Sequence, residues 1–170
     1  LTWNKLILQT LFNMMCVEKM PTMITIKSIV LADDDSDDSL IFKDALKEVG
    51  PSINLTVVKN GRALMQLLRN YAPDMIFLDL DMPYQNGLEC LVEMNTIPAL
   101  QQTPKIVFSS TSRAANIDTA YEMGAHLFFT KLSTYAEQRA ALKAILKLHW
   151  QDPEGVREQY CVNGRYTAFM

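Results

Sequence analysis

Five polar side chains stand where apolar runs of this sequence end. They are the carboxylates of Asp33, Asp34 and Asp79, the hydroxyl of Ser109 and the ammonium of Lys131. Parallel strands of an open α/β sheet deliver their carboxyl ends to one edge, where such sheets hold ligands, so we expect the five groups to converge there. Clustered carboxylates resist ionisation unless a cation lies among them, and oxygen ligands suit Mg²⁺. The pattern therefore predicts a metal site that receives a phosphoryl group.

Some of these acidic residues also have a simpler interpretation. Aspartate often begins a turn, which would explain Asp79 without any function. Residues 33–38 contain five aspartates, and carboxylates in the first turn of a helix interact favourably with its dipole. We assign Asp33 and Asp34 to the site because they come straight off a predicted strand. We interpret the others as a solvated helix start: Asp35, Asp37 and Asp38.

The elements that must position these groups alternate along the chain. Residues 75–78 form a short, unbroken apolar run between Pro73 and Pro83, which is typical of a central strand buried on both faces. Strands that alternate with helices indicate a parallel sheet covered on both faces, because parallel neighbours need crossover connections. We therefore predict one doubly wound α/β domain over residues 24–150. Its other predicted strands are 28–31, 55–58, 105–108 and 127–129.

Apolar residues at helical spacing mark the buried sides of five predicted helices. The first helix should stop at Gly50, the fourth at Gly124 and the last near Trp150. In chain order the buried sides are Ile41, Phe42, Ala45, Leu46 and Val49; Leu64, Leu67, Leu68 and Tyr71; Leu88, Leu91 and Val92; Ile117, Ala120 and Tyr121; and Leu142, Ile145 and Leu146.

Composition narrows the class of protein. The 170 residues are 49% hydrophobic and 21% charged, which suffices for one globular domain with some chain to spare. A net charge of -3, without a block of lysine and arginine, argues against nucleic-acid binding. Cys16, Cys90 and Cys161 are far apart and lack metal-ligand spacing, so we expect reduced thiols in a cytosolic protein.

The first 22 residues differ in character from the predicted domain. The apolar stretch 6–17 is too short, and too interrupted by polar residues, to span a bilayer, so no membrane association is expected. One lysine precedes the stretch and no small-residue cleavage site comes after it, which argues against a signal peptide. We interpret residues 1–22 as a loosely attached, poorly ordered extension, with a docked amphipathic helix as the alternative.

Residues 151–170 form a C-terminal tail that is too short for a DNA-binding or enzymatic output module. We therefore expect the domain to act through a protein partner. Asn163 and Gly164, between β-prone residues, predict a hairpin. A lone hairpin is marginal in water, so it should dock on the domain or bind another molecule. A disordered tail is the alternative.

Four short motifs together resemble the receiver domain of two-component response regulators. Their separations fit as well: 46 residues from Asp33 to Asp79, 30 more to Ser109 and 22 more to Lys131. The resemblance covers residues 26–148 and implies a flavodoxin-like fold with strand order 2-1-3-4-5, of which a chemotaxis receiver is a known example. The motifs are Leu31-Ala32-Asp33-Asp34-Asp35, Phe77-Leu78-Asp79-Leu80-Asp81-Met82-Pro83, Phe108-Ser109-Ser110 and Phe128-Phe129-Thr130-Lys131.

The resemblance implies a phosphoacceptor and a magnesium site. Asp79 would attack a phosphohistidine on a sensor histidine kinase or a histidine phosphotransfer protein. Asp34 and Asp79 would bind Mg²⁺ directly, Asp33 would act through water, and the backbone carbonyl of Asp81 would complete the protein ligands. The chain would be a stand-alone phosphoacceptor that can also lose its phosphoryl group, and not an enzyme with a separate substrate. No glycine motif for ATP is present.

The resemblance also implies residues that hold the phosphoryl group and transmit the signal. Lys131 would offset charge on the transferring group, and Ser109, where the family more often has threonine, would hydrogen-bond the acyl phosphate. Phe128 would be the aromatic switch that turns inward, with a plain core residue as the alternative. The partner would dock on residues 113–123, strand five and the last helix, unless the chain is a phosphate sink without output.

One departure from the family is clear. The family usually has proline after the lysine, joined by a cis peptide bond, whereas this chain has Leu132. A cis bond before a residue other than proline costs about 2.5–4 kcal/mol. We therefore predict a trans bond between Lys131 and Leu132, or else a cis bond that the surrounding packing enforces, with the lysine placed somewhat differently than in the family.

Two other classes share part of the pattern. Asp79-Leu80-Asp81 resembles the nucleophile motif of haloacid-dehalogenase-type phosphatases, but those have threonine or valine in place of Pro83, and their second acidic pair lies downstream. Residues 33–44 have acidic spacing like that of an EF-hand calcium loop. However, Asp38 stands where that loop needs glycine and Asp44 where it needs glutamate. The receiver fits better than either class.

Overall fold

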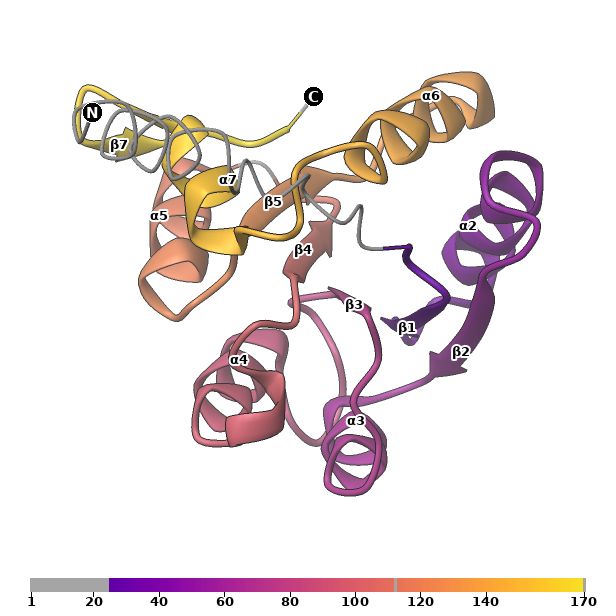
Figure 1. Cartoon of the computed structure of the whole chain (residues 1–170), viewed down its shortest axis with the longest axis horizontal. Helices are drawn as coiled ribbons and strands as arrows, with labels where there is room; N and C mark the ends of the chain where they lie inside the picture. Colours follow the sequence, from indigo (N-terminus) through magenta and orange to yellow (C-terminus); the bar gives the residue numbers. More distant parts are fainter. Residues whose placement is uncertain (1–24, 112, 170) are drawn as a thin grey trace, which may run out of the picture.

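Five parallel strands form the central sheet (Figure 1). The computed structural model describes residues 25–111 and 113–169, so the predictions for residues 1–22 and for Cys16 lie outside the described part of the chain. The spatial order of the strands is β2-β1-β3-β4-β5, which confirms the predicted flavodoxin-like α/β fold. Each predicted strand agrees with the observed one to within one residue at either end. The strands are β1 (Ser28–Ala32), β2 (Asn54–Val58), β3 (Met75–Leu78), β4 (Lys105–Ser109) and β5 (Leu127–Thr130).

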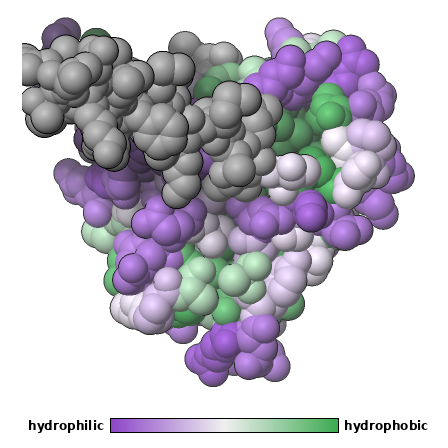
Figure 2. All heavy atoms as spheres, in the orientation of Figure 1, coloured by the Kyte–Doolittle hydropathy of each residue, from purple (hydrophilic) through white to green (hydrophobic). Residues whose placement is uncertain are grey.

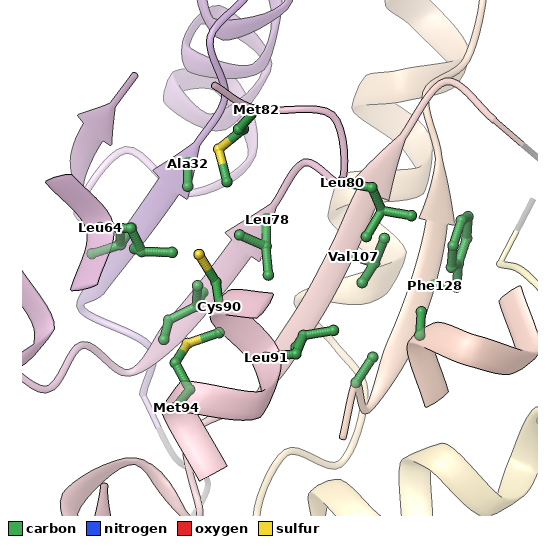
Figure 3. Packing of buried hydrophobic residues seen from close by; sticks show 14 of the residues in the cluster. Ala32, Leu64, Leu78, Leu80, Met82, Cys90, Leu91, Met94, Val107 and Phe128 are labelled. Atoms are coloured by element: carbon green, nitrogen blue, oxygen red, sulfur yellow. The ribbon is translucent and has the colours of Figure 1, made fainter. Parts of the chain in front are cut away.

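Helices cover both faces of this sheet. One face carries α2 (Ser36–Val49) and α6 (Tyr135–Ile145), and the other carries α3 (Gly61–Leu68), α4 (Gly87–Asn95) and α5 (Ala114–Glu122). The short 3-10 helix η1 (Pro98–Leu100) precedes β4. Successive strand residues point to opposite faces, so the strands contribute to two separate cores and are apolar without interruption. Figure 3 shows the core under α3 and α4, where helix residues pack on the sheet: Leu64, Leu91 and Met94 against Leu78 and Val107.

Side-chain caps fix where the helices begin. The Asp35 carboxylate accepts hydrogen bonds from the N–H groups of Asp37 and Asp38, as expected of a residue at the start of α2. Asn86 and Glu89 form a reciprocal capping box at the start of α4. These caps set the two helix starts nearest to the ends of β1 and β3.

The predicted buried sides of the helices were partly wrong. Ile41 is 39% exposed, Val92 is 49% exposed, and Tyr71 is 38% exposed and lies beyond the end of α3. Successive residues are about 100° apart around a helix, so Phe42 and Leu91 occupy the core while their neighbours Ile41 and Val92 flank it. Four other residues predicted to be buried are only partly buried: Val49, Leu67, Leu88 and Leu146. Conversely, Cys90 and Met94 are fully buried although they were not predicted to be.

The last helix of the domain ends earlier than predicted. Helix α6 stops at Ile145, and Trp150 lies in the turn after it, where its indole N–H donates to the Ile145 carbonyl at 2.7 Å. The indole therefore still packs in the core, although it is not helical.

A further helix and a hairpin come after the domain. They are α7 (Pro153–Gln159) and the antiparallel pair β6 (Cys161–Val162) and β7 (Arg165–Tyr166). Asn163 and Gly164 have φ of 52° and 75°, as a tight hairpin turn requires. The predicted hairpin is thus present, and it docks on the domain. Helix α7 was not predicted, although Asp152 followed by Pro153 is a recognisable helix start.

The visible surface is mainly hydrophilic at its outline, with hydrophobic residues scattered between (Figure 2). Scattered apolar residues are normal on a protein surface and mark no interface by themselves. Within residues 25–111 and 113–169, no helix has both the length and the apolar character that crossing a bilayer requires.

Gly87, the first residue of α4, lies directly against the loop after β3. A Cβ at this position would meet the carbonyl oxygen of Asp79 and lie 2.8 Å from the Cα of Leu80, and both are backbone atoms. We expect Gly87→Ala to lower the free energy of unfolding by about 1–3 kcal/mol in a urea titration, the usual cost of overpacking.

Gly50→Ala is the matched control. A Cβ at Gly50 would meet only side-chain atoms of Ile53 and Leu46, which can move aside. Equal losses of stability in the two variants would contradict the close approach of α4 to Asp79.

Candidate functional site

The predicted site residues meet at the carboxyl edge of the sheet. Asp33 follows β1, Asp79 follows β3, Ser109 ends β4 and Lys131 follows β5. The N–H of Asp79 donates to the carbonyl of Ala32 at 2.8 Å, and the N–H of Lys131 donates to the carbonyl of Ser109 at 2.9 Å. Parallel pairing therefore holds the ends of these strands level with one another.

The ammonium of Lys131 lies at the centre of an acidic cluster. Its Nζ is 2.7 Å from Oδ2 of Asp79, 2.9 Å from Oδ2 of Asp33 and 2.8 Å from Oδ2 of Asp38. The Lys131 side chain is only 9% exposed, and its Nζ lies 5.1 Å from the centre of the Phe108 ring. Such ion pairs are weakly screened by salt. Removal of the ammonium would leave buried carboxylates without compensation.

Both buried carboxylates are also oriented by backbone groups. Oδ1 of Asp79 accepts from the N–H of Asp81 at 3.2 Å, while its Oδ2 faces Lys131. Oδ1 of Asp33 accepts from the N–H of Asp35 at 2.9 Å. Each carboxylate therefore has one oxygen fixed by the backbone and one directed at the ammonium.

Burial and charge oppose each other in the titration of these groups. Burial raises the pKa of Asp33 above its usual value, although the hydrogen bond and charge of Lys131 act against the rise. Burial alone would lower the pKa of Lys131, but its hydrogen bonds to Asp38, Asp79 and Asp33 outweigh this and hold the pKa well above its usual range. Lys131 is therefore an ammonium at neutral pH.

Three carboxylates of the cluster fit a divalent cation. Asp33, Asp34 and Asp79 each offer one oxygen, and these oxygens lie within 4.8 Å of one another. Asp34 is exposed and the other two are buried, so the group is reached from solvent past Asp34. With Asp38 the cluster has four carboxylates and one ammonium, and a cation with oxygen ligands would reduce this excess of negative charge. The donor set fits Mg²⁺, while a role for the carbonyl of Asp81 stays a prediction.

Ser109 and Phe128 are both fully buried. The hydroxyl of Ser109 accepts from the N–H of Thr111 at 3.4 Å. The ring of Phe128 lies in the core shared with α3, α4 and α5 (Figure 3). An inward turn of this ring would have to start from another conformation, so packing in the core is what the structure shows and the switch role stays a prediction.

Asp38 was wrongly interpreted as part of a solvated helix start. Its carboxylate pairs with Lys131, because the first turn of α2 faces the ends of β1 and β3. No local spacing indicates this pairing, because Asp34 precedes the helix cap Asp35 and the contact depends on how α2 packs on the sheet. Asp35 does belong to the helix start, as interpreted, and its carboxylate caps α2.

The bond between Lys131 and Leu132 is trans, as predicted, because the described residues contain no cis peptide bond. The lysine still reaches Asp33 and Asp79 from this backbone. Leu132 itself packs at the rim of the core on the α2 and α6 side of the sheet.

The chain is similar to known sequences. The family model described as "Response regulator receiver domain" matches residues 29–143. Response regulator Rcp1 of Synechocystis sp. is 28% identical over 112 residues, which cover 62% of this chain and 76% of that protein. Transcriptional regulatory protein CpxR of Escherichia coli (strain K12) is 31% identical over 130 residues, which cover 74% of this chain and 52% of CpxR. The chain thus matches about half the length of CpxR.

Solved structures share the fold. The crystal structure of the Mn(2+)-bound form of Rcp1 has a TM-score of 0.65 and 25% identity, covering 72% of this chain and 93% of that one. That of the phosphorylated cyanobacterial phytochrome response regulator RcpA has a TM-score of 0.66 and 26% identity, covering 71% and 91%. With its sheet order, acidic cluster and family match over residues 29–143, the chain belongs to the response regulator receiver domain family of two-component systems, in which phosphorylation of an aspartate is characteristic.

Proposed function

We propose that this chain accepts a phosphoryl group on Asp79 from the phosphohistidine of a sensor histidine kinase or a histidine phosphotransfer protein. The observation that carries the proposal is the 2.7 Å contact between Oδ2 of Asp79 and the nearly buried ammonium of Lys131. Asp79 is 6% exposed, and Asp33 and Asp34 lie beside it. A buried nucleophile between an ammonium and a set of metal-type ligands suits phosphoryl transfer, which depends mainly on positioning and charge.

The chemistry uses the two differently held oxygens of Asp79. An oxygen of the carboxylate attacks phosphorus, a phosphorus–oxygen bond forms, and the phosphorus–nitrogen bond to the imidazole breaks with its electron pair on the nitrogen. Lys131 keeps its charge and stabilises the phosphoryl oxygens as negative charge moves onto them. The N–H of Asp81 holds the second oxygen in place, so the nucleophile is already oriented. Attack of water on the acyl phosphate would return the chain to its starting state.

Mg²⁺ is the proposed cofactor. Asp34 and Asp79 would bind it directly, Asp33 would act through water, and the carbonyl of Asp81 would complete the protein ligands. When bound, it would neutralise charge on the phosphoryl oxygens. The carboxylate oxygens within 4.8 Å of one another support this assignment.

The output of the proposed reaction is contact with a downstream protein. Ser109 would hydrogen-bond the acyl phosphate. Ser109 pairs with Thr130 of β5 in the sheet, and the Ser109 carbonyl accepts from the N–H of Lys131. A movement of Ser109 would therefore be passed to β5. The proposed docking surface consists of α5, β5 and α6. A chain that takes the phosphoryl group without any change at this surface would instead serve as a phosphate sink.

Acetyl phosphate with Mg²⁺ should label the wild-type chain with one phosphoryl group, detected by intact mass. Asp79→Asn should abolish the label, because the amide is a poor nucleophile. Asp44→Asn is the matched control: it removes an exposed carboxylate of α2 outside the cluster and should keep the label. Labelling of Asp79→Asn at the wild-type level would rule out Asp79 as the phosphoacceptor.

Ser109→Ala should separate phosphorylation from response. The variant lacks the hydroxyl that would bind the acyl phosphate, so it should be labelled but show smaller amide chemical-shift changes over α5, β5 and α6 than the wild type. If phosphorylation leaves that surface unchanged in the wild type as well, the phosphate sink is the better description.

Millimolar Mg²⁺ should raise the melting temperature of the unphosphorylated chain, because a ligand that binds only the folded state stabilises it. A concentration of 100 times Kd would contribute about 2.7 kcal/mol. Asp34→Asn should reduce the rise. Asp37→Asn, which removes the same charge from the same helix start outside the cluster, should keep it. A full metal response in Asp34→Asn would contradict the proposed ligand set.

A further inference from the structure

The surface proposed for partner docking already has an occupant. Residues 153–169, hereafter the C-terminal segment, comprise α7, the β6–β7 hairpin and the chain up to Phe169. The segment lies beside α5 and the end of β5 (Figure 1). Its Tyr166 ring stacks on the Tyr121 ring of α5, with centroids 4.3 Å apart and planes 12° apart.

The segment binds the outer edge of β5 in the manner of an added strand. In the described sheet β5 pairs with β4 on one side only, so its other side presents backbone groups for pairing. The carbonyl of Phe128 accepts from the N–H of Phe169 at 2.7 Å, and Phe129 forms a parallel bridge with Phe169. The N–H of Phe128 donates to the Tyr121 hydroxyl at 3.0 Å. Strand addition of this kind is a recurring way to recognise peptides.

Specific polar contacts fix the segment along α5. The hydroxyl of Tyr121 donates to the carbonyl of Thr167 at 3.1 Å, and Asp118 accepts from the N–H of Tyr166 at 3.2 Å. Arg157 donates to the carbonyl of Tyr121 at 2.9 Å and lies 5.3 Å from the centre of the Tyr166 ring. The site thus contacts both backbone groups of the segment and its Tyr166 ring.

A second aromatic ring forms one wall of a groove beside α6. Phe169 lies at an apolar groove whose α6 side is formed by small residues, Ala140, Ala141 and Ala144. Its ring meets that of Phe129 edge to face at 6.1 Å. The occupant therefore places two rings, three residues apart, on either side of the β5 edge.

The contact with the β5 edge is short enough to be exchangeable. The strands of the hairpin have two residues each, and the pairing with β5 is a single bridge. A hairpin of this size has little stability of its own. Peripheral elements open at lower free energy than the core, and none of residues 161–169 is buried.

We infer that α5, the outer edge of β5 and the alanine groove of α6 form a peptide-binding site that the C-terminal segment holds in its own chain. The partner that fits is a protein with an extended segment carrying two aromatic residues three positions apart, as Tyr166 and Phe169 are. Such a partner displaces residues 161–169, while α7 keeps Val156 in the core. The site lies on the docking surface of the proposed function, but its occupation by residues 161–169 is tested without phosphorylation of Asp79.

The test uses a fluorescent peptide with the sequence of residues 160–170, carrying Cys161→Ser to avoid disulfides. Wild-type chain should bind it weakly, since its own segment competes. Tyr166→Ala in the full chain should weaken that competition and bind the peptide about tenfold more tightly, because the fraction of free sites rises. Phe169→Ala should act in the same direction by removing the ring that packs on Phe129. Tyr71→Ala, which changes an exposed tyrosine away from the segment, should match the wild type.

The location and the specificity are checked separately. Bound peptide should slow amide hydrogen exchange in α5 and β5, and a peptide with alanine at both aromatic positions should not bind. If residues 161–169 exchange freely in Tyr166→Ala or Phe169→Ala and the peptide still does not bind, the site is not exchangeable and the inference fails. It also fails if neither variant loosens the segment. If the loosened variants instead form a dimer without peptide, the occupant of the site is the segment of a second copy of this chain, and the inferred partner protein is wrong.

Discussion

The attraction between one nearly buried ammonium and three carboxylates holds the carboxyl edge of the sheet together. Lys131 follows β5, Asp33 and Asp79 follow β1 and β3, and Asp38 lies in the first turn of α2, so these ion pairs join four elements. At a given distance, charges attract more strongly where water is scarce than at the surface. The cost of breaking such a set is correspondingly large, since the remaining charges stay buried. The same contacts therefore stabilise the fold and keep Asp79 oriented for chemistry.

Strand β5 connects this edge with the proposed docking surface. Its carboxyl end delivers Lys131 to the acidic cluster, its side chains alternate between the two cores, and its outer edge binds Phe169. Phe128 takes part in both the core and the docking surface. Its ring is in the core, while its N–H donates to Tyr121 and its carbonyl accepts from Phe169. The phosphoryl site and the docking surface are thus linked through a single strand.

The strands were easy to predict for a physical reason. A parallel strand covered on both faces must be apolar at every position, so Met75 to Leu78 cannot be confused with an edge strand or a loop. The helices were harder, because each needs only one buried side and a rotation of about 100° per residue decides which. Ile41 and Val92 stand beside core residues in the sequence and yet flank the core in space. Local spacing shows that a helix is amphipathic but does not fix its rotation on the sheet.

The sequence by itself determined the strand order through its resemblance to a known family. It also determined which groups reach the carboxyl edge, because the carboxyl ends of parallel strands all lie at the same edge of the sheet. The tertiary structure alone decided what those groups contact. Asp38 pairs with Lys131 because α2 turns its first residues toward the strand ends, and such an orientation depends on packing far along the chain. Likewise, the Asn163-Gly164 turn predicted a hairpin but not its partner. That partner is β5 with α5, reached through contacts such as the one from Thr167 to Tyr121, 46 residues apart, which no local pattern encodes.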